Sequence, residues 1–154
     1  MVEYSAGILL YRRRPGLEVF LAHMGGPFWA RKDAAAWSIP KGLYVPGEEE
    51  PLAAALREFA EEVGAPAPRA DYVPLGEFRQ PSGKRLTVFV GEGEAEFVGS
   101  NTFEMEWPPR SGRIQQFPEM DAGQWFTLED ARVKIVKGQA AILDSGLIAS
   151  AASG

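Results

Sequence analysis

The spacing of hydrophobic positions predicts two β-hairpins, one on each side of an amphipathic helix. Residues 4–12 and 17–24 are rich in Ile, Leu, Val, Tyr and Phe, and the turn signal Pro15-Gly16 separates them. Such runs around a proline–glycine turn favour a hairpin. Residues 71–79 and 84–98 repeat the arrangement around a second turn with proline and glycine. In the last run Leu or Val recurs at every second position, which is the period of a strand.

The helix is expected between Pro51 and Gly64. Proline suits the first helical position, where its missing N–H is no loss, and glycine supplies the C-terminal stop. Four apolar side chains between them follow a four, three, four spacing: Leu52, Leu56, Phe59 and Val63. At ~100° per residue these positions form one stripe roughly 60° wide. We expect this stripe to face a hydrophobic core.

The rest of the chain completes an α+β domain. In order, the sequence predicts a loop at 25–36, a short strand from Trp37 to Gly42, a long irregular loop at 99–120, a short strand at Gln124–Phe126 and an interrupted helix from Thr127 to Asp144. We expect one domain over residues 1–154, in which a mixed β-sheet lies between helices. The Ala/Ser-rich end, from about residue 148, is expected to be frayed.

Three carboxylates lie on the helix away from its apolar stripe. Glu58, Glu61 and Glu62 fall within an arc of roughly 100° on the helical wheel. Like charges at this spacing repel one another and destabilise the helix. Two explanations stay open: the face is simply solvated, as most charged helix faces are, or a divalent cation compensates. Ligation by oxygen alone suits a hard ion such as Mg²⁺ or Mn²⁺.

The helix and the loop before it together resemble the box of the Nudix hydrolase family, G-x5-E-x7-R-E-U-x-E-E-x-G-U, where U is a bulky aliphatic residue. Six positions match: Gly42, Arg57, Glu58, Glu61, Glu62 and Gly64. The loop carries one extra residue, so either Glu48 or Glu49 stands for the first box glutamate. Phe59 and Ala65 occupy positions where the family prefers aliphatic residues.

The resemblance covers nearly the whole chain and implies the Nudix fold, an α/β/α sandwich. It implies a metal site formed by Glu58, Glu61, Glu62 and the backbone carbonyl of Lys41. It also implies that Arg57 braces the loop through Glu49 or Glu48, and that Gly42 and Gly64 are structural.

A general base, or one further metal ligand, is still needed. By resemblance it comes from a glutamate in the loop before the last strand. Glu119, six residues before Trp125, fits best, and Glu104 and Glu106 are rivals in the same loop.

Aromatic and cationic side chains in the two long loops are candidates for substrate binding. They could stack a base and hold a phosphate. The candidates are Phe28, Trp29, Arg31 and Lys32 in the first loop, Lys41 beside the box, and Phe103, Trp107, Arg110 and Arg113 in the second loop. The alternative for the aromatic residues is that they pack on the sheet.

Composition narrows the functions that this chain can have. A net charge of −5 argues against broad nucleic-acid binding, although bound cations can reverse the sign locally for a small phosphorylated substrate. With no cysteine, thiolate catalysis and cysteine-ligated zinc are excluded. His23 is the only histidine, and we expect it to be a packing or surface residue. No apolar run reaches the ~18 residues of a membrane span, and the cytoplasm is the expected location.

These observations predict a Mg²⁺- or Mn²⁺-dependent hydrolase of a nucleoside diphosphate linked to another group. Nucleoside triphosphates and dinucleoside polyphosphates come first, and ADP-ribose is next. The alternative is a Nudix-fold module that binds a nucleotide or a partner without turnover. Such modules usually lose box carboxylates, which this chain keeps. A homodimer is also compatible with the resemblance.

Overall fold

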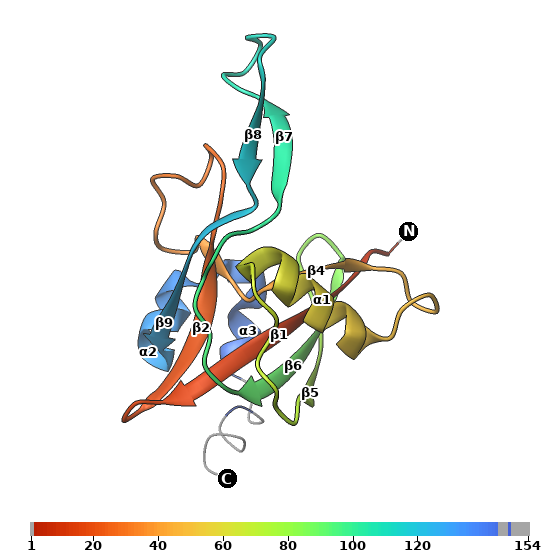
Figure 1. The fold of residues 1–154 in the computed structure, drawn as a ribbon, viewed down its shortest axis with the longest axis vertical. Coiled ribbons are helices and arrows are strands. Elements are labelled where there is room, and N and C mark those ends of the chain that lie inside the picture. Colours follow the sequence, from red (N-terminus) through yellow and green to blue (C-terminus); the bar gives the residue numbers. More distant parts are fainter. Residues whose placement is uncertain (1, 145–147, 149–154) are drawn as a thin grey trace.

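The computed structural model describes residues 2–144 and Ile148. Its centre is a mixed sheet in which β3, β2, β1, β6 and β5 follow one another, while β4 pairs with β1 and β9 pairs with β2 (Figure 1). The strands are β1 (Tyr4–Arg13), β2 (Leu17–Met24), β3 (Trp37–Ser38), β4 (Lys41–Tyr44), β5 (Val73–Arg79), β6 (Arg85–Glu92) and β9 (Met120–Thr127). β1 and β6 run parallel, and the other pairs in the sheet are antiparallel.

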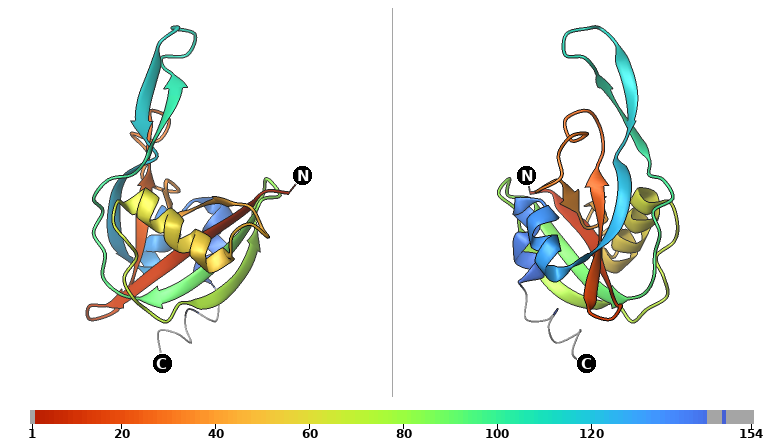
Figure 2. Two further views of the ribbon diagram at one scale, coloured as in Figure 1. Left: turned by 45° about the vertical axis from the view of Figure 1, so that its right-hand side comes forward. Right: turned by 90° about the vertical axis from the view of Figure 1, so that its left-hand side faces the viewer.

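Helices cover both faces of this sheet, so the predicted α+β fold with a mixed sheet is confirmed (Figure 2). Helix α1 (Pro51–Val63) packs on one face, against alternate side chains of β1: Ala6, Ile8 and Leu10. Helices α2 (Leu128–Lys134) and α3 (Ala140–Leu143), joined through the 3-10 turn η1 (Lys137–Gln139), pack on the other. Because successive side chains of a strand point to opposite faces, β1 contributes side chains to the hydrophobic cores on both faces of the sheet. No helix in residues 2–144 is long and apolar enough to cross a membrane.

Helix α1 begins and ends where the sequence predicts. Pro51 is its first residue, and Gly64 follows with φ of 87°, the left-handed conformation that glycine adopts without strain. The buried face differs from the predicted stripe. Phe59 and Val63 are buried, but Leu52 and Leu56 are only partly so, and the core face includes Ala54, Ala55 and Glu62.

The prediction that residues 99–120 form an irregular loop is wrong. It contains an antiparallel hairpin of β7 (Thr102–Glu106) and β8 (Ile114–Pro118), which we call the arm. The arm forms a two-stranded sheet of its own and extends away from the body of the molecule (Figure 2). Side chains along β7 alternate between exposed and partly buried. The sequence shows that alternation in Phe103, Met105 and Trp107, but prolines and glycines around it concealed the pairing.

Other predicted bounds also shift. The strand expected over 84–98 ends at Glu92, and the strand expected at 124–126 begins already at Met120. The single strand expected from Trp37 to Gly42 is two strands, because Pro40 interrupts it; the Pro40 carbonyl instead accepts a hydrogen bond from the Ile8 amide at 3.1 Å. The end expected to be frayed lies outside the described residues, apart from Ile148, which is buried.

Candidate active site

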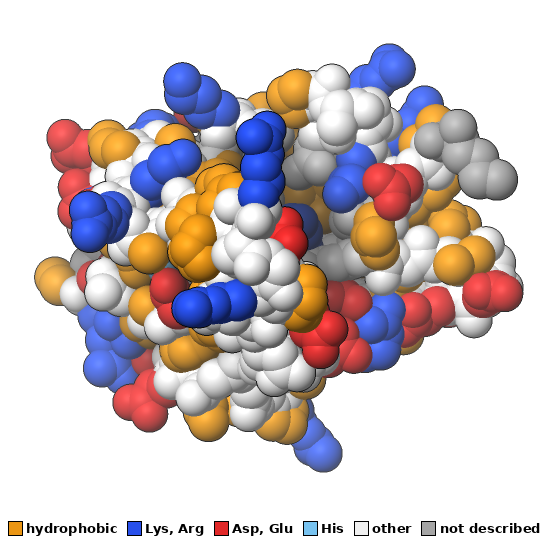
Figure 3. Space-filling model, turned by 90° about the horizontal axis from the view of Figure 1, so that it is seen from above, with side chains coloured by type: hydrophobic (Ala, Val, Ile, Leu, Met, Phe, Trp, Pro, Cys, Tyr) orange, Lys and Arg blue, Asp and Glu red, His pale blue; other side chains and the backbone are white. Residues whose placement is uncertain are grey.

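Helix α1, strand β4 and the base of the arm meet around a cavity of about 390 Å³. We call it the carboxylate cavity. Its lining comes from six separate segments: Ser5, Lys41, Gly42, Leu43, Glu58, Glu61, Glu62, Lys84, Asn101 and Glu119. Seen from above, this end of the molecule carries acidic and basic side chains side by side (Figure 3). The predicted box carboxylates and the predicted base therefore line one cavity.

Gly42 is required by close approach between β4 and α1. It pairs with Ala6 of β1 and lies directly under the carboxylate of Glu58. A Cβ atom at this position would overlap the carboxylate oxygens. The absent side chain thus gives Glu58 its place in the cavity.

Arg57 joins the loop before α1 to the carboxylates. Its Nε and Nη2 donate to the two carboxylate oxygens of Glu49, each at 2.9 Å. Its Nη1 donates to Glu58 at 2.6 Å and to Glu61 at 3.3 Å. The hydrogen bond from Arg57 lowers the pKa of Glu49. Glu48 is exposed, so the geometry favours Glu49 as the glutamate that braces Arg57.

Glu62 is the most buried of the three box carboxylates. Its side chain accepts a hydrogen bond from the Lys41 backbone amide at 3.0 Å, so the main chain of Lys41 lies beside it. Burial raises the pKa of Glu62 to about 8, and the bond from Lys41 offsets only part of this effect. Burial also raises the pKa of Glu58, against the opposing hydrogen bond from Arg57. A cation in the cavity would stabilise both carboxylates in their ionised form.

Backbone hydrogen bonds hold Glu119 on the opposite side of the cavity. Its amide donates to the Asn101 carbonyl at 2.9 Å, and its carbonyl accepts from the Gly25 amide at 2.8 Å. The Asn101 amide in turn donates to the carbonyl of Glu61, near the end of α1, at 3.0 Å. Glu119 is thus fixed relative to the box helix although the two are far apart in sequence. Glu104 and Glu106 lie on the arm and do not line the cavity.

The oxygen atoms that line the cavity suit a hard divalent ion. In this structure, however, the guanidinium of Arg57 compensates the charge of two of the carboxylates. Within the described residues, no group of three or more His, Asp or Glu side chains converges so as to hold an ion as it stands. Arg57 is bonded to Glu58 and Glu61, whose carboxylates a metal would need. Carboxylate and carbonyl oxygens are nevertheless the ligands that Mg²⁺ and Mn²⁺ prefer, so the residue types fit the ion.

Only one of the predicted substrate-binding side chains lines the carboxylate cavity. Lys41 lines the carboxylate cavity, whereas Arg31, Lys32, Phe103, Trp107 and Arg110 do not. The arm and the loop at 25–36 instead contact each other: the rings of Phe28 and Trp107 meet edge to face at 5.4 Å. Arg110, with φ of 61°, lies in the turn that joins β7 to β8. The loop and the arm thus meet outside the lining of the carboxylate cavity.

Besides Leu43, the neighbour of Gly42, sequence reasoning missed three residues of the cavity: Ser5, Lys84 and Asn101. Lys84 reaches the site because β6 runs parallel to β1, which pairs Tyr4 with Arg85. Ser5 arrives by the same pairing, and its hydroxyl is buried without a hydrogen-bond partner among the described residues. The approach of strands distant in sequence leaves no local signal that could have identified them.

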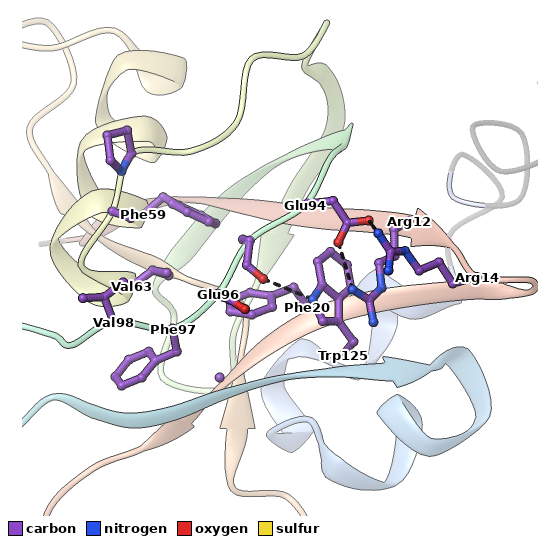
Figure 4. A pocket seen from close by; sticks show the side chains of 14 residues that line it. Arg12, Arg14, Phe20, Phe59, Val63, Glu94, Glu96, Phe97, Val98 and Trp125 are labelled. Carbon is purple, nitrogen blue, oxygen red and sulfur yellow. Dashed lines mark hydrogen bonds and ion pairs between the residues drawn. The ribbon is translucent and has the colours of Figure 1, made fainter.

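A larger cavity of about 1080 Å³ also borders the C-terminal half of α1, where Phe59 and Val63 line it (Figure 4). Phe20, Phe97 and Trp125 line it, and the guanidinium of Arg12 stacks on Trp125 at 4.2 Å. Arg12 is neutralised by Glu18 and Glu94. The three box carboxylates do not line this cavity, so volume alone does not identify the reaction site.

Comparisons with known proteins agree with this geometry. The sequence model of the NUDIX domain matches residues 1–145, whereas no curated protein matches the chain. The chain therefore belongs to the Nudix family, and it is a Nudix pyrophosphohydrolase.

Solved structures share its fold at low sequence identity. A C. elegans Ap4A hydrolase in a binary complex is 22% identical, with 96% of this chain and 98% of that chain covered and a TM-score of 0.63. The NUDIX domain of Shewanella oneidensis NrtR, complexed with ADP ribose, is 15% identical over 97% and 89%, with a TM-score of 0.60. The C-terminal domain of mouse MUTYH, in complex with human PCNA, is 18% identical over 99% and 92%, with a TM-score of 0.61.

Proposed function

We propose that this protein hydrolyses a pyrophosphate bond in a nucleoside diphosphate linked to another group, with Mg²⁺ or Mn²⁺ as cofactor. One observation carries the proposal: Glu58, Glu61, Glu62 and Glu119 line a single cavity that also contains Lys41 and Lys84. Nucleoside triphosphates and dinucleoside polyphosphates are the first candidates, and ADP-ribose is the next. The cytoplasmic location, the single domain over residues 1–154 and a homodimer stay predictions.

Some residues of the cavity would bind the ion, and others would attract the phosphates. Glu58, Glu61, Glu62 and the Lys41 carbonyl would hold the divalent ion. When bound, such an ion neutralises phosphate charge and lowers the pKa of a coordinated water. Lys41 and Lys84 would attract the negative phosphate chain into the cavity.

Glu119 would accept a proton from the attacking water, since it lines the same cavity and is held by backbone bonds on both sides. Arg57 would act by positioning: its bidentate bond to Glu49 holds the loop, while its bonds to Glu58 and Glu61 compensate their charge. Ion binding would compete with those last two bonds.

The arm and the loop at 25–36 would recognise the part of the substrate beyond the phosphates. Phe28 is exposed, Trp107 is partly exposed, and each has a ring face on which a base could stack. The ring of Phe103 lies close to Gly26 of the loop. Arg31, Lys32 and Arg110 would supply cations for phosphate binding, and the ammonium of Lys32 lies 5.2 Å from the ring of Trp29.

The test is product release from a panel of nucleoside triphosphates, dinucleoside polyphosphates, ADP-ribose and nucleotide sugars, with Mg²⁺ or Mn²⁺. Glu61→Gln and Glu62→Gln are assayed beside the parent, and Glu129→Gln, an exposed carboxylate on α2, is the matched control. Loss of several kcal/mol of charge stabilisation corresponds to about 10²–10³ in kcat. We expect both box variants to fall by this factor and the control to match the parent.

No turnover of any substrate, or turnover indifferent to both box substitutions, would contradict the proposal. Metal-dependent nucleotide binding without turnover would then favour the alternative, a module that binds a nucleotide or a partner. The shared fold of a MUTYH domain found in complex with PCNA makes a partner-binding role worth testing in that case.

A further inference from the structure

His23, the only histidine of the sequence, is buried near the end of β2 and uses both ring nitrogens. Its Nδ1 lies 2.7 Å from a carboxylate oxygen of Asp121, and its Nε2 lies 2.6 Å from the backbone carbonyl oxygen of Lys32. The ring of Trp37 packs edge to face against it at 5.0 Å. One side chain therefore joins β2, β3, β9 and the loop at 25–36.

The two partners of His23 can only accept hydrogen bonds. A backbone carbonyl has no proton to donate, and an ionised carboxylate has none either. The hydrogen bonds that join β9 and the loop at 25–36 at this point therefore depend on donors of the His23 ring. Asp33, which is paired with Lys134 of α2, lies on the same loop.

Asp121 is the extra residue of a β-bulge. His23 pairs with Ala122 of β9, but Met24 pairs with Met120, so Asp121 has no partner residue on β2. Bulges re-aim side chains and are common next to active sites. The bulge comes directly after Glu119, whose carbonyl accepts from the Gly25 amide. A slip of one residue in β9 would turn its side chains to the opposite face and would move Glu119.

We propose that His23 is a positioning residue for Glu119. Through its contact with Asp121 it fixes the bulge of β9, and through its contact with the Lys32 carbonyl it fastens the loop at 25–36 to the same point. It does not line the carboxylate cavity, and so it acts through the segment that carries Glu119. The catalytic part of this inference rests on the proposed function, whereas the structural part does not.

The structural part is tested by amide hydrogen exchange, measured by NMR on ¹⁵N-labelled protein. In Asp121→Ala and in His23→Phe, which keeps a ring against Trp37 but has no donor, the Gly25 amide should exchange with solvent at least tenfold faster than in the parent. Unchanged Gly25 exchange in both variants would overturn the inference.

The catalytic part is tested by a double-mutant cycle. We expect His23→Phe to lower kcat about tenfold in the parent but less than twofold in a Glu119→Gln background, because residues that act as a unit are not additive. Arg132→Gln, which breaks an exposed ion pair with Asp144, is the control and should leave kcat unchanged. Equal losses in both backgrounds would overturn the inference. If the parent turns over no substrate, the proposed function fails and the NMR result still decides the role of His23.

Discussion

The carboxylate cavity and the arm are held in place by different kinds of contact. Around the cavity, β1 is bonded to β4 and β6 at its N-terminal end. Helix α1 is tied to β4 through Glu62 and Arg57, and to the loop through the bond from Arg57 to Glu49. The two strands of the arm pair only with each other, and ring contacts such as Phe28–Trp107 join it to the loop at 25–36. An isolated two-stranded hairpin is marginally stable in water.

Under the proposed function, this difference would separate chemistry from recognition. Reacting groups need placement within a fraction of an ångström; the box carboxylates lie on α1, and backbone hydrogen bonds hold Glu119 just before β9. The arm would recognise the substrate through its aromatic side chains. We therefore expect substitutions at the cavity to change kcat and substitutions on the arm to change KM.

Apart from substitution of the carboxylates themselves, the largest effect is expected from Gly42→Ala. The new Cβ would displace the flexible carboxylate of Glu58, and misplacement of a reacting group by about 1 Å can cost 10²-fold in rate. We expect kcat to fall by about that factor while the thermal midpoint changes little. Gly16→Ala, with open space around its Cβ, is the control. Full activity in Gly42→Ala would show that Glu58 need not lie where it does.

The pH dependence of stability should reveal the buried state of Glu62. The folded protein retains a proton on Glu62 up to about pH 8, whereas an unfolded glutamate releases it near pH 4.5. This contribution to stability is complete below pH 4.5 and is lost as the pH rises to about 8. The Glu62→Gln variant has no carboxyl to ionise and does not show this loss. Between pH 5.5 and 8.5, its free energy of unfolding should therefore rise by on the order of 2 kcal/mol relative to that of the parent.

The measurement is chemical denaturation of both proteins at the two pH values, with a chelator present. Adding Mg²⁺ at pH 8.5 should raise the stability of the parent but not that of Glu62→Gln, because an ion that binds only the folded state stabilises it. A stability difference between the two proteins that stays constant with pH would contradict the burial of an ionisable group.

Substitution of Glu49 and of Glu48, the two candidates for the first box glutamate, should change kcat by different factors. Glu49→Gln weakens the bidentate bond to Arg57, and loss of such a supporting contact typically costs about 10–100-fold in activity. We expect kcat to fall about tenfold. Glu48→Gln at the neighbouring exposed position is a matched control and should change kcat less than twofold. Steady-state kinetics of the two variants would decide between them, and the reverse order would assign the brace to Glu48.

The smallest effect is expected on the arm. Base–aromatic stacking contributes about 1–3 kcal/mol, so Trp107→Ala should raise KM several-fold and leave kcat within twofold. Ile114→Ala, on an exposed position of β8, is the control. A large fall in kcat for Trp107→Ala would show that the arm takes part in the chemical step, and the separation drawn above would be wrong.

Much of the fold could be predicted because its signals are local. The turn at Pro15-Gly16, the proline start and glycine stop of α1, and the two hairpins of the main sheet all follow from neighbouring residues. The arm was missed since its alternation is short and is interrupted by Pro108 and Pro109. The role of His23 as a link between four segments was missed too, because its partners Lys32 and Asp121 come together only through β2 and β9.

The sequence by itself determined the helix of the box, the family and the type of chemistry, because these depend on residue identities at short spacings that helical geometry brings together. Only the tertiary structure decided that Glu62 is buried, that Glu49 rather than Glu48 contacts Arg57, and that Ser5, Lys84 and Asn101 line the cavity with Glu119. These facts depend on the parallel pairing of β1 with β6 and on the bulge in β9. Contacts between distant strands are set by how the whole sheet packs, and no local pattern along the chain encodes them.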